Sequence, residues 1–126
     1  MYSREVLDHF EHPRNAGAVA QPDASVQIEN PACGDILKLT LRISGERIEE
    51  IRFQAKGCVA SMACGSALTD LVRGKSIEQA RALAEEELLD AVGGLPAASR
   101  HAVHLALDAL GAALHQLDGR EERGGG

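Results

Sequence analysis

Alternating apolar and polar residues predict a small sheet in the first half of the chain. Residues 26–28, 36–43 and 48–53 alternate in this way, which is typical of strands with one side facing solvent. The link between the second and third segments, residues 44–47, is short and contains Gly45, as in a hairpin. We therefore expect these two strands to be antiparallel and the first to complete a three-stranded sheet.

Apolar residues at helical spacing lie on both sides of these strands in the sequence. Ser3 is a good N-cap for a short first helix, which Pro13 ends. After Cys58 the apolar residues recur every three or four positions until Gly74, which predicts a second helix directly after the sheet. Further helices are predicted at residues 76–83, 85–92 and 97–117.

The last predicted helix has two different faces, because successive residues turn by about 100°. An apolar stripe, expected to face the core, consists of Val103, Leu107, Leu110, Leu114 and Leu117. A polar group on another side, within a sector of roughly 60°, consists of His101, His104, Asp108 and His115.

The whole pattern predicts an α+β fold. In it a small three-stranded antiparallel sheet is packed by helices on one face, with an N-terminal helix and a long C-terminal helix. A chain of 126 residues is within the usual size of one domain. We expect that domain to span residues 1–118 and residues 119–126, which contain no apolar side chain, to form a disordered tail.

Composition excludes several classes of function. The net charge of −6 and the scattered basic residues argue against a nucleic-acid partner. No apolar run approaches the roughly 20 residues needed to cross a bilayer, and the N-terminus does not resemble a signal peptide. We therefore expect a cytoplasmic protein, in which the three cysteines serve as free thiols in metal binding, nucleophilic chemistry or packing rather than in disulfides.

Three places in the sequence carry candidate chemistry. Cys33 and Asp35 flank Gly34 in a loop between strands, where both could bind one cation or simply form a turn. Cys58 lies where a strand ends and a helix begins, a position that favours thiolate, although a packed thiol is the alternative. His101 could be a nitrogen ligand or part of an exposed polar face. Together thiolate, imidazole and carboxylate suit zinc or an iron-sulfur cluster, and the carboxylate makes the set more labile.

Short motifs follow one another along most of the chain: Tyr2-Ser3, Asp8-His9, His12-Pro13-Arg14-Asn15-Ala16-Gly17, Pro31-Ala32-Cys33-Gly34-Asp35, Lys56-Gly57-Cys58, Val72-Arg73-Gly74-Lys75-Ser76, Leu95-Pro96, His101 and Asp108-Ala109. In these motifs the sequence resembles the IscU and NifU N-terminal domain family, the scaffolds of iron-sulfur cluster assembly. The match extends from Tyr2 to about Leu117 in the right order and spacing.

The resemblance implies a scaffold or carrier rather than an enzyme. It implies that Cys33, Asp35, Cys58 and His101 surround a site for a 2Fe-2S cluster, for iron, or for zinc in the isolated protein. The implied partners are a cysteine desulfurase that supplies sulfur and acceptor iron-sulfur apoproteins. By the same resemblance, Asp35 keeps the cluster exchangeable.

The chain also departs from the family pattern. Ala102 stands where the family usually has a third ligand cysteine, so Cys64 or His104 could replace it. Because Cys64 falls on an apolar stripe, we favour a packing role for it. A homodimer is a further alternative, since clusters are often held between subunits when one chain lacks ligands.

A second departure from the family pattern concerns the transfer of a cluster to other proteins. Residues 95–99 read Leu-Pro-Ala-Ala-Ser in place of the Leu-Pro-Pro-Val-Lys stretch that a dedicated chaperone recognises in Isc-type members. An alternative function is therefore a zinc-held accessory that accepts sulfur or regulates the desulfurase without building clusters. A Cys-dependent enzyme with Cys58 as nucleophile and His101 as base is disfavoured, because no oxyanion pocket is visible in the sequence.

Overall fold

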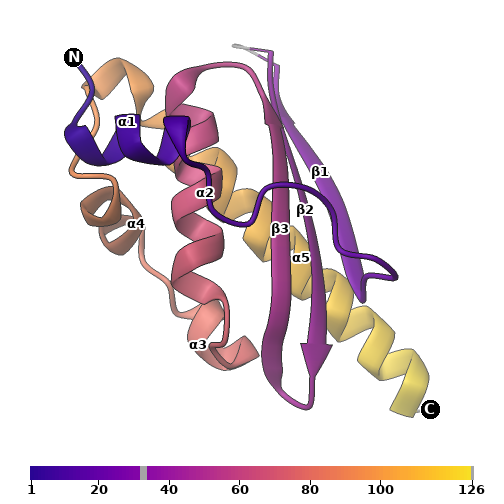
Figure 1. Ribbon diagram of the computed structural model, residues 1–126. Coiled ribbons are helices and arrows are strands. Elements are labelled where there is room, and N and C mark those ends of the chain that lie inside the picture. The colour runs from indigo at the N-terminus through magenta and orange to yellow at the C-terminus, as the bar shows by residue number, and fades with distance from the viewer. Residues whose placement is uncertain (32–33, 126) are drawn as a thin grey trace.

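The computed structural model describes residues 1–31 and 34–125, and the side chains through Gly119 apart from those at 32 and 33. The predicted α+β class is confirmed: a three-stranded sheet lies beside helices, with a long helix at the C-terminal end (Figure 1). The elements in chain order are α1 (Arg4–Glu11), β1 (Ala24–Asn30), β2 (Asp35–Ser44), β3 (Arg47–Lys56), α2 (Val59–Val72), α3 (Ile77–Arg81), α4 (Glu85–Ala91), the 3-10 turn η1 (Ala97–Ser99) and α5 (His101–Gly125).

The sheet has the strand order β1-β2-β3, and both neighbouring pairs are antiparallel, as predicted. Ile36 pairs with Lys56 and Leu39 with Phe53. This pairing places the first residue of β2 next to the residues that follow β3. The register shifts once, between Arg42 and Ile43 near the hairpin.

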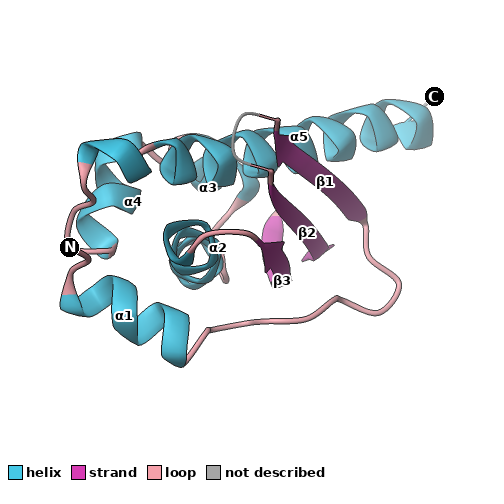
Figure 2. Ribbon diagram, turned by 90° about the horizontal axis from the view of Figure 1, so that it is seen from above, coloured by secondary structure: helices cyan, strands magenta, loops and turns pink. Residues whose placement is uncertain are grey.

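The alternation of β2 decides which face of the sheet meets the helices. Leu37, Leu39 and Leu41 are all 1% exposed or less, and they pack in one core with residues of α2 and α5. Both helices lie on the same side of the sheet (Figure 2). A leucine so fully buried contributes about 1.5–3 kcal/mol to folding.

The other face of the sheet is partly covered by the segment between α1 and β1. Thr40, which the alternation would place on the wet face, is only 3% exposed. Its hydroxyl accepts a hydrogen bond from the Val19 N–H at 2.8 Å. Before that point the segment pairs with the edge of β3, where Gly17 N–H donates to the Phe53 carbonyl at 2.8 Å. An irregular segment therefore covers a sheet edge that would otherwise be open.

The helix α2 is buried along most of its length, and at Gly65 it approaches the sheet closely. Ala60, Ala63 and Ala67 are at most 1% exposed. A Cβ placed on Gly65 would lie 2.8 Å from the Phe53 ring and 3.1 Å from Leu37. This glycine is required by packing, not by its backbone angles.

The last helix begins and ends later than the periodicity suggested. Residues 97–99 form the 3-10 turn, so α5 starts at His101, and it runs to Gly125. Its predicted apolar stripe is largely buried, with Val103, Leu110, Leu114 and Leu117 at 4% exposure or less. The division of the chain at residue 118 stays a prediction. Within the residues described, no helix is both long and apolar enough to cross a membrane.

We predict that Gly65→Ala lowers the free energy of unfolding by about 1–3 kcal/mol, the usual range for overpacking a core. The matched control is Gly111→Ala, because Gly111 is exposed on α5 and an added Cβ meets nothing within 4 Å. This control should stabilise the protein by about 0.5–1 kcal/mol through helix propensity. Urea unfolding monitored by circular dichroism measures both, and equal effects would contradict the close approach of α2 to the sheet.

Candidate metal centre

Three elements bring a carboxylate, a thiol and an imidazole together at one end of the sheet. Asp35 is the first residue of β2, Cys58 is the N-cap of α2, and His101 begins α5. One ligand atom from each lies within 4.8 Å of the other two. Asp35 Oδ2 is 3.2 Å from Cys58 Sγ and 3.1 Å from His101 Nε2, and these last two atoms are 3.9 Å apart.

The carboxylate of Asp35 is almost completely buried, at 2% exposure. Its Oδ1 accepts the Cys58 backbone N–H at 3.1 Å, and its Oδ2 accepts the Ser61 hydroxyl at 2.7 Å. Burial raises the pKa of Asp35, but hydrogen bonds from Ser61, from Cys58 and from His101 together outweigh burial, and the net pKa lies below the ordinary value. The group therefore carries a negative charge at neutral pH.

The thiol of Cys58 is half-buried at the start of α2. The Ser61 N–H donates to Sγ at 3.4 Å, so sulfur takes the place of a hydroxyl or carboxylate as the side-chain cap of the helix. The positive end of the helix dipole stabilises negative charge at this position.

The imidazole of His101 is oriented from its other side by the turn that precedes α5. Nδ1–H donates to the Ala98 carbonyl at 3.2 Å, which leaves Nε2 directed at Asp35. A backbone carbonyl on the remote nitrogen is the usual way in which proteins orient a metal-binding histidine. His104, one turn later, is exposed and pairs instead with Glu85 at 2.9 Å. Asp108 and His115 are exposed too.

Gly57 allows the strand-to-helix junction to pass directly beside Asp35. Its φ is +137°, a value that L residues rarely adopt, and a Cβ added there would overlap Asp35 Oδ1. A side chain at position 57 would displace the carboxylate from the group. The backbone angle and the closeness of Asp35 thus explain why glycine lies between Lys56 and Cys58.

The remaining predicted site residues divide into two cases. Cys33 lies outside the described residues, so the structure neither adds it to the group nor removes it. Ala102, where the family pattern would have a third ligand cysteine, is 1% exposed. The description of the chain as a variant that lacks a third ligand thiolate stays a prediction.

Cys64 belongs to the core. It is 0% exposed and packs within the same cluster as Leu37 and Phe53. Burial, and to a smaller extent the nearby Cys58, raise the pKa of its thiol to about 12. A thiol that stays protonated is a poor ligand, which supports the packing role favoured for Cys64.

Ser61 is a member of the cluster that the sequence patterns did not single out as a site residue. It is 1% exposed, and its hydroxyl lies 2.7 Å from Asp35 Oδ2 and 3.3 Å from Cys58 Sγ. A serine at the third position of a helix often faces the N-cap. The place of Ser61 in the first turn could have indicated its contact with Cys58. It could not have indicated the contact with Asp35, which belongs to a strand distant in the sequence.

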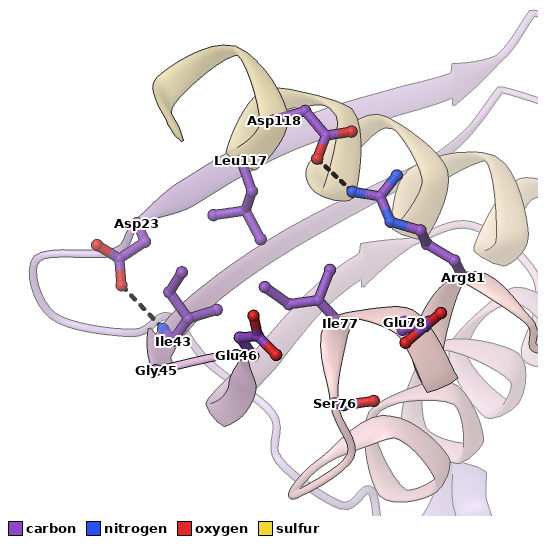
Figure 3. A pocket seen from close by; sticks show the side chains of 10 residues that line it. All are labelled: Asp23, Ile43, Gly45, Glu46, Ser76, Ile77, Glu78, Arg81, Leu117 and Asp118. Carbon is purple, nitrogen blue, oxygen red and sulfur yellow. Dashed lines mark hydrogen bonds and ion pairs between the residues drawn. The ribbon is translucent and has the colours of Figure 1, made fainter. Parts of the chain in front are cut away.

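A cavity of about 580 Å³ lies elsewhere, between the β2–β3 hairpin, α3 and the end of α5 (Figure 3). Ile43, Ile77 and Leu117 give it apolar walls, and an ion pair joins Arg81 and Asp118 at its edge. It is separated from the metal-binding candidates by the length of β3, which at ten residues is about 30 Å. Among the residues that the structure describes, the cavity and the candidate centre have none in common.

Comparison with known proteins assigns the family. A family model described as "NifU-like N terminal domain" matches residues 1–123. The chain is 41% identical over 110 residues to "Iron-sulfur cluster assembly scaffold protein IscU 1" of Archaeoglobus fulgidus, an alignment that covers 87% of this chain and 72% of the relative. It is 36% identical over 125 residues to "Iron-sulfur cluster assembly scaffold protein IscU" of Escherichia coli K12, covering 96% and 97%.

The chain therefore belongs to the NifU-like N-terminal domain family, and the resemblance seen in the sequence is confirmed. A solved structure of a NifU-like N-terminal protein from Brucella abortus has a TM-score of 0.76 with 17% identity, over 92% of this chain and 93% of that one. At this identity the likeness concerns the fold alone.

We predict that Gly57→Ala lowers the free energy of unfolding by more than about 3 kcal/mol, because backbone strain of about 1–3 kcal/mol adds to the displacement of Asp35. Gly74→Ala is the control, since Gly74 also has a positive φ, +82°, but an added Cβ meets nothing within 4 Å. This control should cost only about 1–2 kcal/mol. Chemical denaturation compares the two, and equal losses would mean that the contact with Asp35 is unimportant.

We predict that Cys64 resists alkylation in the folded protein. In a variant with Cys33→Ser and Cys58→Ser it is the one remaining thiol of the sequence, and a pKa of about 12 leaves on the order of 10⁻⁴ of it ionised at pH 8. Mass spectrometry should show much slower iodoacetamide labelling than in urea, with a native rate that rises as the pH rises. Rapid labelling without urea would place Cys64 outside the core.

Proposed function

We propose that this chain is a scaffold for iron-sulfur cluster assembly, and that it holds iron and sulfur at Cys33, Asp35, Cys58 and His101. The observation that carries the proposal is the group of Asp35, Cys58 and His101, whose ligand atoms lie within 4.8 Å of one another in a member of this family. Scaffolds of this class are not enzymes: their iron and sulfur are material to be passed on.

The chemistry of the donors fits such a cargo. Thiolate and imidazole bind iron-sulfur clusters and zinc well, and carboxylate is the weaker donor of the three. Cys33 is included because it precedes Asp35 by two residues in the sequence. A set that mixes strong and weak donors suits a metal that has to leave again.

Loading requires the protein to give up protons. The thiol of Cys58 donates to Asp35 Oδ2, and His101 Nε2 lies 3.1 Å from the same oxygen. Sγ and Nε2 must both be free of hydrogen when they bind a metal. The hydrogen bond from His101 Nδ1 to Ala98 keeps the ring in place while Nε2 changes partner. We therefore expect metal affinity to fall as the pH is lowered.

The finer assignments belong to the same proposal. We propose that the cluster is of the 2Fe-2S type, that iron binds during assembly, and that zinc occupies the site in isolated protein. A cysteine desulfurase supplies the sulfur, and iron-sulfur apoproteins accept the cluster. A homodimer would supply further ligands for a cluster shared between subunits. A reducing compartment such as the cytoplasm suits these free thiols.

A second candidate function follows from Ala102. With no thiol at that position, the chain could hold zinc and accept sulfur from the desulfurase, or regulate it, without building clusters. Incubation with a cysteine desulfurase and cysteine separates the two functions by mass spectrometry and visible absorption. Persulfide on Cys33 or Cys58 without a cluster supports the accessory role, and a cluster supports the scaffold.

We predict that anaerobic reconstitution with iron and sulfide gives visible absorption in the wild-type protein, and that Cys33→Ala, Cys58→Ala or His101→Ala abolishes or strongly reduces it. His104→Ala is the matched control, because His104 lies one turn away on α5 and is exposed. It should reconstitute like the wild type. Metal and sulfide analysis of each product measures the loading, and unchanged loading of both Cys58→Ala and His101→Ala would remove the proposed site.

A further inference from the structure

Ser61 occupies a special place in the group around Asp35. It lies in the first turn of α2 and is 1% exposed. Its hydroxyl donates to Asp35 Oδ2 at 2.7 Å, and its backbone N–H donates to Cys58 Sγ at 3.4 Å. Ser61 therefore contacts two of the candidate metal ligands, Asp35 and Cys58.

The two oxygens of Asp35 have different partners. Oδ1 accepts the backbone N–H of Cys58 at 3.1 Å and faces the chain at Gly57. Oδ2 faces the thiol of Cys58, the imidazole of His101 and the hydroxyl of Ser61. Oδ2 is therefore the oxygen that lies among the metal-binding candidates.

Not every group that can donate a hydrogen bond to Asp35 Oδ2 can still do so once a metal is bound. Cys58 Sγ and His101 Nε2 bind a metal only without hydrogen, so neither atom donates to Oδ2 in the loaded site. Ser61 keeps its hydrogen, because a neutral hydroxyl is not required to bind the metal. Among the residues described, Ser61 is thus the donor that stays on Oδ2 in both states.

We propose that Ser61 is a positioning residue of the metal site, which holds Asp35 Oδ2 toward Cys58 and His101 through its hydroxyl. The inference rests on the proposed function, because it concerns the same site. Ligand carboxylates depend on outer hydrogen bonds of this kind, and their removal typically costs about 10- to 100-fold in metal affinity.

The same helix offers a matched control in Ser66. Ser66 is 0% exposed, and its hydroxyl also has two partners, the ring of His9 at 2.7 Å and the backbone N–H of Arg14 at 2.8 Å. Those partners tie α2 to α1 and to the segment after it, not to Asp35. Ser→Ala at either position removes a buried hydroxyl from α2, but only one of the two changes touches the site.

The test is an anaerobic Co²⁺ titration, because the visible bands of this ion report both affinity and ligand geometry. We expect Ser61→Ala to bind Co²⁺ about 10- to 100-fold more weakly than the wild type, with shifted bands, and Ser66→Ala to bind within about twofold with unchanged bands. Circular dichroism checks that each variant is folded. Affinity and bands like those of the wild type in Ser61→Ala overturn the proposal, and so does an equal loss in Ser66→Ala.

A double-mutant cycle shows whether Ser61 acts through Asp35. In an Asp35→Ala background, Ser61→Ala should change Co²⁺ affinity by less than about twofold. A full additional loss there overturns the proposal, because Ser61 would then act independently of the carboxylate. Cys58→Ala distinguishes failure of the proposed site from failure of the proposed role of Ser61. If Cys58→Ala leaves Co²⁺ binding unchanged, the proposed site itself is overturned. If Cys58→Ala weakens Co²⁺ binding but Ser61→Ala does not, only the role of Ser61 is overturned.

Discussion

Asp35 reaches Cys58 because β2 and β3 pair in one particular register. The pairing of Ile36 with Lys56 sets the residue before Ile36 beside the residues after Lys56. The same register turns Leu37 and its alternate neighbours toward the helices, where they are buried. Slipping by one residue would expose those leucines and rotate Asp35 to the opposite face. Core packing of the sheet therefore holds the carboxylate in the candidate centre.

The position of His101 depends on the same core. The apolar stripe of α5 packs in one cluster with the sheet, with Val103 and Leu110 at most 3% exposed. This packing leaves the first residue of α5 at the end of the sheet where β2 begins. The turn at Ala97–Ser99 then supplies the Ala98 carbonyl that orients the ring. The helix and the turn together direct His101 Nε2 toward Asp35.

Much of the fold could be predicted from the sequence, because alternation and helical spacing record which side chains are buried. The three strands, the hairpin, the Ser3 cap and the helix after Cys58 follow from local pattern. Thr40 could not be assigned, because its burial depends on Val19 from a segment without periodicity. The start of α5 was also misplaced, since Ala97 and Ala98 suit a helix as well as a 3-10 turn. The proximity of Asp35, Cys58 and His101 came from the family resemblance, because local spacing does not report contacts across 66 residues.

Buried polar side chains in the described part of the protein all have hydrogen-bond partners, and Asp35 is among them. Its partners include Cys58 and His101, the same groups proposed to bind the metal. In a zinc finger the ion supplies the folding energy, and the chain unfolds without it. Here Asp35, Cys58 and His101 contact one another without an ion, and the sheet and helices have a packed core of their own. A round of the proposed loading and release would therefore begin and end with the same folded molecule.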